Sequence, residues 1–109
     1  MSGCCQVTTT LPDRTAAERV ATQLVEERLA ACAQVIGPVR SIYWWAEKLE
    51  QADEWYCHLK TTIARLPRIE TRIRELHPYE VPEIIAVPIL QGNSDYLKWI
   101  QDMVRSEAP

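Results

Sequence analysis

Hydrophobic and polar positions follow two different periods along the chain, and these periods divide it into strands and helices. Residues 4–10 are β-prone and are closed by Leu11-Pro12-Asp13, which predicts a first strand. A helix is expected next, because apolar residues recur every three or four positions after a T-x-x-E capping box formed by Thr15 and Glu18. This apolar stripe consists of Ala17, Val20, Ala21, Leu24, Val25 and Leu29.

The middle of the chain predicts a long β-hairpin. Residues 31–45 are rich in β-branched and aromatic side chains, and Gly37-Pro38 predicts a bend or bulge because proline cannot donate a ladder hydrogen bond. The polar residues 46–53 predict the hairpin tip, and residues 54–62 the returning strand. Alternation in that strand predicts one face with Trp55, Cys57, Leu59 and Thr61 and another with Glu54, Tyr56, His58 and Lys60.

The last third of the chain predicts helix, strand and helix. Pro67 suits the first position of a helix that ends before His77-Pro78. Residues 84–89 predict a buried strand, and a turn at residues 92–94 opens a short helix. The apolar stripe of the first of these helices is Leu66, Ile69, Ile73 and Leu76, and that of the second is Tyr96, Leu97, Ile100, Met103 and Val104.

The element order is therefore βαββαβ with a terminal helix, in one domain over residues 1–109. This order predicts an α+β, ferredoxin-like fold: an antiparallel sheet with both main helices on one face. The other face lacks a cover, although the hairpin strands carry bulky residues on both sides. We expect an interface between copies of the chain there, because large uncovered aromatic surfaces are normally interfaces. Its predicted residues are Tyr43, Trp44, Trp45 and Trp55.

Composition and charge exclude several classes of protein. The net charge is −3 and the pI about 5.4, so no electrostatic footprint indicates nucleic acid or an anionic membrane. The N-terminus does not resemble a signal peptide, and the longest apolar stretch, residues 84–90, is far too short to span a membrane. We therefore expect a soluble, cytoplasmic protein without nucleic-acid or membrane partners. The arginines at 65, 68, 72 and 74 alternate with Glu70 and Glu75, which indicates a solvated helix face.

The four cysteines, at positions 4, 5, 32 and 57, form no C-x-x-C pair and no zinc-site spacing. Cys4 and Cys5 are adjacent in a strand, so their side chains should point to opposite faces. We interpret most of these cysteines as small buried hydrophobic residues in a reducing compartment.

Several segments resemble one known family, the CutA divalent-cation tolerance proteins. Residues 27–35, ERLAACAQV, are similar to the family's E-x-L-A-A-C-x-N signature, and residues 41–45, SIYWW, with residues 60–62 resemble its central hairpin. Residues 77–85, HPYEVPEII, resemble its most recognisable motif. Single positions that also match are Lys48, Glu50, Glu54, Gly92, Tyr96, Leu97 and Trp99. The resemblance covers nearly the whole chain in the right order.

The resemblance implies a ferredoxin-like homotrimer in which long hairpins wrap around neighbouring subunits. It also implies a role in tolerance and response to copper and other divalent ions, and an architecture akin to the trimeric PII signalling proteins. At two places the chain departs from the family. Ala46 and Glu47 replace the usual Glu-Gly pair, although glycine often serves where φ is positive. Some members of the family have a cysteine where this chain has Thr9, and two consecutive histidines where it has Leu76-His77. Of that possible soft metal site, this chain keeps only the imidazole of His77.

His77 is the first candidate for chemistry, as a ligand for a metal or an anion. The alternative is that its ring interacts with the carbonyls at the helix C-terminus, where a cation is favoured. Glu80 and Glu83 flank Pro82, and their hard oxygens suit zinc, manganese or magnesium better than copper(I), unless they satisfy backbone donors. The sequence thus predicts at most a weakly bound divalent metal, copper or zinc, with His77 and Glu83 as ligands.

A small anionic ligand is the other candidate, and the predicted ligand-binding residues are Lys60, His77, Tyr79 and Glu83. Lys60 precedes two threonines, which suits an anion site at a subunit cleft, although an edge charge that deters aggregation is a serious alternative. We interpret His58 as an exposed or interface residue and Cys32 as core, because nothing nearby in the sequence would lower the pKa of the Cys32 thiol.

Three functions compete. The first is a non-enzymatic trimeric binding or signalling protein linked to metal tolerance, with a PII-like small-ligand sensor as a close variant. The second is a ferredoxin-like enzyme at the subunit cleft, such as an acylphosphatase, but Leu11-Pro12-Asp13 offers no phosphate-cradling loop. The third, an RNA-recognition module, needs exposed aromatic and basic residues that residues 54–58 do not supply. We favour the first function and expect no catalytic residues.

Overall fold

The computed structural model describes residues 2–105 as four strands and three α-helices. In chain order these are β1 (Cys4–Leu11), α1 (Arg14–Glu26), β2 (Cys32–Trp45), β3 (Lys48–Thr62), α2 (Leu66–Leu76), β4 (Ile84–Pro88) and α3 (Ser94–Met103). A 3-10 turn, Ile63–Arg65, leads from β3 into α2. The predicted element order is confirmed.

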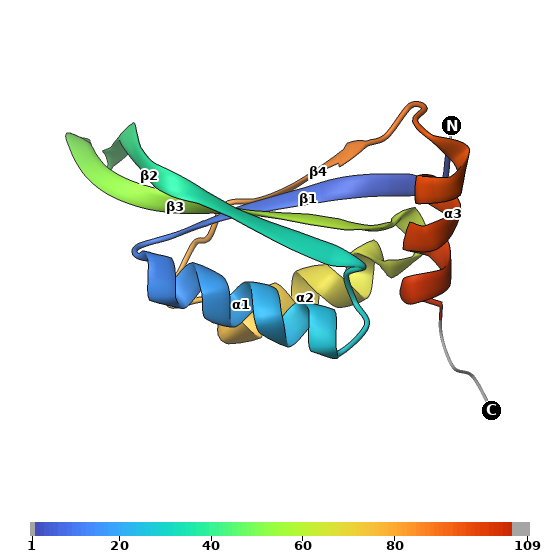
Figure 1. The fold of residues 1–109 in the computed structure, drawn as a ribbon. Helices are drawn as coiled ribbons and strands as arrows, with labels where there is room; N and C mark the ends of the chain where they lie inside the picture. The colour runs from blue at the N-terminus through green and yellow to red at the C-terminus, as the bar shows by residue number, and fades with distance from the viewer. Residues whose placement is uncertain (1, 106–109) are drawn as a thin grey trace.

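The strands form one antiparallel sheet in the order β2-β3-β1-β4. Helices α1 and α2 lie side by side under one face of the sheet, and α3 stands across the end that carries the N-terminus (Figure 1). The β2–β3 hairpin projects past the helices at the other end. The predicted ferredoxin-like α+β fold is confirmed.

Helix α1 begins and ends with defined capping structures. The carboxylate of Asp13 accepts a hydrogen bond from the backbone N–H of Ala16 at 2.8 Å, so Asp13 is the N-cap and the predicted Thr15–Glu18 capping box is wrong. At the other end Arg28 has a φ of 61°, and the N–H of Leu29 bonds to the carbonyl of Leu24 at 3.0 Å. This reversal is a Schellman ending, and it turns Leu29 into the core although Leu29 lies beyond the helix.

The core lies between the sheet and the two helices. It contains alternate residues of β1 and β3 and the apolar stripes of α1 and α2, with Cys5, Leu24, Leu59 and Ile73 among its members. Cys4 belongs to a second cluster, under α3, with Ile100 and Val104. The expected opposite orientation of the adjacent cysteines is therefore confirmed. Cys4, Cys5 and Cys57 are buried, whereas Cys32 is only partly buried.

The hairpin is longer, and its tip tighter, than the polar residues 46–53 indicated. Strand β3 begins at Lys48, which pairs with Trp45, so only Ala46 and Glu47 form the turn. Their φ angles of 50° and 63° are those of a type I′ turn, the two-residue connection that matches strand twist. Polarity was misleading here because both faces of the projecting arm meet solvent in a single subunit.

The predicted irregularity at Gly37-Pro38 is confirmed as a register shift between Ile36 and Val39, next to a cis Gly37–Pro38 peptide bond. Gly37 is needed for space. A Cβ at this position would lie 2.5 Å from Cδ2 of Trp55, so the bulge lets the indole ring pack directly against the backbone.

The sheet face opposite α1 and α2 is largely uncovered. The predicted burial of β4 is wrong for a single subunit, because Ile85 and Val87 are 51% and 55% exposed on this open face. Ile36 of β2 is exposed as well. On α3, Ile100 and Val104 dock as predicted, whereas Tyr96 stays exposed. Within residues 2–105, no helix has the length and apolar character needed to cross a membrane.

Candidate functional site

A groove of about 730 Å³ lies where the hairpin joins the sheet. One wall is the C-terminal half of β2, and the other is the loop after α2, in which Pro78 and Pro82 restrict the backbone. The floor includes Thr10 of β1 and Glu54 and Tyr56 of β3. The remaining lining residues are Val39, Arg40, Ser41, Ile42, Tyr43, Trp45, Pro78, Tyr79, Glu80, Val81 and Glu83.

Glu54 is the central polar residue of this floor. Its side chain is buried, with 8% exposure, and its Oε2 accepts a hydrogen bond from the Tyr79 hydroxyl at 2.8 Å. This bond joins β3 to the loop after α2. Burial, and then the hydrogen bond and the charge of Glu54, raise the pKa of the Tyr79 phenol, so Tyr79 is a hydrogen-bond donor at neutral pH.

Glu83 contributes a second carboxyl group to the same groove. Its pKa is raised above the ordinary value, mainly because burial disfavours the charged form and also because Glu54 repels it. Glu54 and Glu83 both line the groove. With Glu80 they give the groove an acidic character, which does not suit the predicted anionic ligand.

His77 lies behind the groove and is not among its lining residues. The Nε2–H of its buried ring donates to the carbonyl of Thr10 at 2.7 Å, and Nδ1 accepts from the N–H of Tyr79 at 3.1 Å. Burial lowers the pKa of the imidazole despite the opposing effects of the Thr10 carbonyl and Glu54. The ring thus anchors the loop in its neutral form, and this conformation leaves neither nitrogen free for a metal.

Lys60 stands apart from the groove. It lies six residues beyond Glu54 on β3, which corresponds to about 20 Å along a strand. Its Nζ donates to Oε1 of Gln34 at 2.7 Å on the open face. Next to it, His58 stacks on Tyr56 and bonds to the Thr8 hydroxyl. The structure therefore brings Tyr79 and Glu83 together but does not bring Lys60 to them.

The four aromatic residues predicted as an interface fall into two groups. Tyr43, Trp44 and Trp45 belong to the projecting arm, where Trp44 and Trp45 are 73% and 53% exposed. The strand register places Tyr43 and Trp45 on the face of Glu54 and Trp44 on the opposite face. Trp55 instead packs against its own core, with the guanidinium of Arg14 5.9 Å from its ring centre.

Sequence reasoning missed the role of Glu54. Alternation placed it on the correct face with Tyr56 and His58, but an alternating pattern reports a side chain's face and not its burial. The burial depends on Tyr79, twenty-five positions later in the chain. The available signal was a glutamate two positions before Tyr56, on the same face of the strand.

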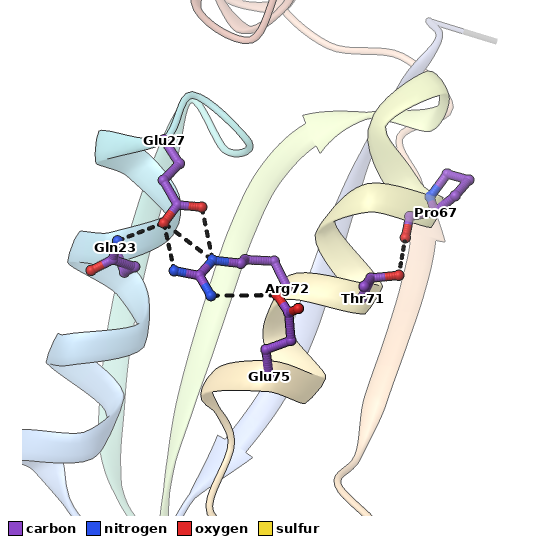
Figure 2. A network of polar contacts seen from close by, with 6 residues as sticks. All are labelled: Gln23, Glu27, Pro67, Thr71, Arg72 and Glu75. Atoms are coloured by element: carbon purple, nitrogen blue, oxygen red, sulfur yellow. Dashed lines mark hydrogen bonds and ion pairs between the residues drawn. The ribbon is translucent and has the colours of Figure 1, made fainter.

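A second polar cluster joins the ends of α1 and α2 on the far side of the sheet (Figure 2). Arg72 reaches across to Glu27 and donates to both of its oxygens at 2.8–3.1 Å, and Gln23 donates to the same carboxylate. These hydrogen bonds lower the pKa of Glu27 to about 2. The exposed Arg74–Glu70 pair fits the solvated helix face that the charge pattern predicted. Arg72 is only 30% exposed, and Arg65 lies in the 3-10 turn before α2 and donates to the carbonyl of Val104 at 2.8 Å, so these two depart from the prediction.

The donor groups of the groove do not fit a closed metal centre. Within residues 2–105, no three His, Cys, Asp or Glu side chains are grouped closely enough to hold a metal ion. Both nitrogens of His77 are engaged, and Glu54 is bound by Tyr79. A metal would have to displace existing hydrogen bonds, so we derive no chemistry through one.

Comparison with known proteins identifies close relatives. The family described as CutA1 divalent ion tolerance protein matches residues 5–103. Divalent-cation tolerance protein CutA of Thermus thermophilus is 42% identical over 93 residues, which cover 85% of this chain and 90% of that protein. The CutA homolog of Xenopus laevis is 45% identical over 95 residues, which cover 87% of this chain and 63% of that protein. This chain therefore spans nearly all of the bacterial relative but less than two thirds of the animal one.

Solved structures agree with this match. The crystal structure of CutA1 from Shewanella sp. SIB1 superposes with a TM-score of 0.92 at 43% identity, covering 95% of this chain and 97% of that chain. CutA from Archaeoglobus fulgidus, described as a periplasmic divalent cation tolerance protein, gives a TM-score of 0.91 at 33% identity over 94% of this chain and 99% of that chain.

Proposed function

The chain belongs to the CutA1 divalent ion tolerance family, and we propose that it is a homotrimeric, non-enzymatic binding protein that acts in tolerance and response to divalent metal ions, copper among them. We further propose that it binds a small ligand in the groove at the hairpin base, in the manner of a signalling trimer. The cytoplasm is its predicted location, although one relative is described as periplasmic.

The open sheet face is the observation that carries the assembly. Ile36, Ile85 and Val87 are all more than half exposed there in a single subunit. Monomeric proteins rarely leave so large an apolar surface in water, whereas interfaces between subunits routinely cover one. The exposed tryptophans of the arm extend this surface beyond the sheet. The number three comes from the family resemblance.

A binding role suits the chemistry of the groove better than a catalytic one. The imidazole of His77 is fixed as a donor to Thr10 and an acceptor from Tyr79, so it has no free nitrogen to act as a general base. Tyr79 is occupied by Glu54. These bonds make the groove rigid, which favours ligand recognition.

Copper or zinc binding by His77 and Glu83 stays a prediction, and the observed hydrogen bonds count against tight binding. His77 would first have to give up its bond to Thr10 or to Tyr79. Tolerance through the assembled protein and its ligand requires no resident metal centre in one subunit.

The test is growth of cells that lack their own CutA protein in graded copper and zinc. We expect the wild-type chain to restore tolerance and Trp45→Glu to fail, because the variant puts a charge into the proposed interface. Arg68→Ala, on the solvated face of α2, is the matched control. If tolerance is not restored by a wild-type chain that is expressed and folded, the proposal is wrong.

A further inference from the structure

His58 lies in the middle of the open face of the sheet. The register places it in a row that crosses all four strands, in which Thr8 lies beside it on β1, Gln34 on β2, and Ile85 beyond Thr8 on β4. This is the face whose exposed apolar residues carry the proposed assembly, and His58 is partly exposed on it in a single subunit. A copy that covers Ile85 on one edge and Ile36 on the other therefore covers the imidazole between them.

Contacts within the subunit hold the ring of His58 in its neutral form. Its Nδ1 lies 2.9 Å from the hydroxyl of Thr8 and 3.3 Å from Nε2 of Gln6. An amide nitrogen can only donate, so Nδ1 accepts from Gln6 and carries no proton. The ring also stacks on Tyr56, with ring centroids 5.2 Å apart. These contacts join β1 and β3 of one chain, so they do not depend on a partner.

The charged neighbour of this ring is positive. Lys60 lies two positions further along the same face of β3, about 7 Å away. Its Nζ donates to Oε1 of Gln34, the residue directly opposite His58, at 2.7 Å, which holds the ammonium group beside the imidazole. Burial, and then the charge of Lys60, lower the pKa of His58.

The other side chains that face His58 do not offset this charge. From β1, β2 and β4 they are the uncharged Gln6, Thr8, Gln34, Ile85 and Val87. The adjoining rows add the phenol of Tyr56 and the thiol of Cys32, which contacts the hydroxyl of Tyr96 on α3 at 3.4 Å. Glu54 is four positions away on β3, about 13 Å, and is bonded to Tyr79. Glu83 precedes β4, which β1 separates from β3.

We propose that His58 makes the assembly sensitive to acid, because its protonation places a second positive charge beside Lys60 in each covered face and loosens the contact between copies. The proposal rests on the proposed assembly through the open face and deepens it by naming a group that regulates it. A partner that covers the ring removes more water from it, which disfavours the imidazolium further. The neutral ring is therefore preferred in the assembly.

The sign of the pH dependence follows from this preference. A histidine whose pKa is lower in the assembly than in the separated subunit contributes fully to association at pH 8, where both forms are neutral. The contribution is lost as the pH falls below about 6.5, the ordinary value for histidine, because the separated subunit takes up the proton first. Each copy supplies one imidazole, so the loss is repeated in every subunit.

The experiment measures subunit exchange between unlabelled and isotope-labelled samples of the full chain at pH 8 and pH 5.5. Urea just below the unfolding transition makes exchange measurable, and native mass spectrometry after rapid buffer exchange counts the mixed assemblies. We expect wild-type subunits to exchange at least about tenfold faster at pH 5.5. In His58→Gln the rate should change by less than about threefold. His77→Gln removes the other histidine of the chain and should keep the tenfold ratio.

Three results would overturn the proposal for a wild type that is assembled at pH 8. The first is an exchange rate that is the same at both pH values, and the second is an equal acceleration in His58→Gln. The third is slower exchange at pH 5.5, which would show that a carboxylate of a neighbouring copy faces His58. If His58→Gln does not assemble, Lys60→Gln replaces it, and an undiminished pH ratio there overturns the proposal. A wild-type mass of one subunit at pH 8 refutes the assembly itself, so the two failures are distinguishable.

Discussion

Thr9 carries a hydroxyl group that its surroundings do not use. The side chain is fully buried on the core side of β1, and its Oγ1 has no hydrogen-bond partner within residues 2–105. An unpaired buried hydroxyl costs about 1–3 kcal/mol. We therefore predict that Thr9→Val, which keeps the shape and removes the polar atom, raises the free energy of unfolding by about 1 kcal/mol. Urea denaturation of the wild type and the variant at the same protein concentration measures this change in the free energy of unfolding.

Thr61 provides a matched control for Thr9. It is equally buried, but its hydroxyl donates to the carbonyl of Leu29 at 2.7 Å. Thr61→Val should therefore lower the free energy of unfolding by about 1–2 kcal/mol. If the two substitutions change stability in the same direction, hydrogen bonding does not distinguish these sites.

The buried ring of His77 predicts a dependence of stability on pH. Its pKa is lowered in the folded protein, so the unfolded chain takes up a proton first as the pH falls. Stability from this group is therefore complete above about pH 6.5, the usual value for an unfolded histidine, and is lost as the pH falls toward the lowered pKa.

We expect the free energy of unfolding to decrease between pH 7.5 and pH 5.5, and to decrease less steeply in His77→Gln. His58 has a lowered pKa from burial and from Lys60, so it contributes in the same direction and remains in the variant. Denaturant titrations at several pH values provide the slopes. An unchanged slope in His77→Gln would mean that the ring is not held neutral.

At the scale of elements, the two-residue turn of the hairpin is strained, because a residue other than glycine occupies a position with positive φ. Glu47 adopts a φ of 63°, which costs a residue with a Cβ about 1 kcal/mol. We predict that Glu47→Gly raises the free energy of unfolding by roughly that amount, because glycine adopts positive φ freely.

Glu50→Gly, in the adjoining strand, is the control for the turn. Here glycine should lower the free energy of unfolding by about 0.5–1 kcal/mol, because it adds freedom to the unfolded chain without relieving strain. Hydrogen exchange of the arm, compared between the two variants and the wild type, reports the local effect. Equal losses of protection would show that Glu47 is not strained.

Local patterns predicted the elements well where they depend on neighbours in sequence. Side-chain period and proline chemistry predict the stripes of α1 and α2, the bulge at Gly37-Pro38 and the two faces of β3. One member of the α1 stripe, Val25, is exposed instead of buried. The start of α1 was misplaced by two residues because Thr15 fits a capping box as well as Asp13 fits an N-cap. The prediction that β4 is buried was wrong for a single subunit. A continuous apolar run indicates that a strand needs to be covered, but it does not indicate whether the same chain or another copy covers it.

The candidate site was predicted only in part for a similar reason. Tyr79 and Glu83 were found from a motif resemblance, and both line the groove. His77 was found as well, but sequence left its role as ligand or anchor open, and its bonds to Thr10 and Tyr79 define the anchor. The role of Glu54 was missed, and the separation of Lys60 from the groove was not foreseen, because the relevant distances join β3 to elements distant in the chain.

At the scale of the whole molecule, one subunit exposes apolar side chains in two places, the open sheet face and the projecting arm. The open face of the sheet carries exposed Ile85 and Val87, and the projecting arm carries exposed Trp44 and Trp45. Each large apolar side chain that becomes fully buried contributes roughly 1.5–3 kcal/mol. In the proposed trimer each such contact would be repeated three times and would stabilise the small subunit.

The most direct test is the mass in solution, measured by light scattering coupled to size exclusion at micromolar concentration. We predict a mass of about three times the chain's 12.5 kDa for the wild type and for Arg68→Ala. At least one of Trp44→Glu and Trp45→Glu should dissociate or aggregate, because an unpaired charge is not tolerated in a desolvated interface. A wild-type mass near 12.5 kDa would contradict the assembly outright, and tryptophan variants that both keep the wild-type mass and melting temperature would contradict its proposed surface.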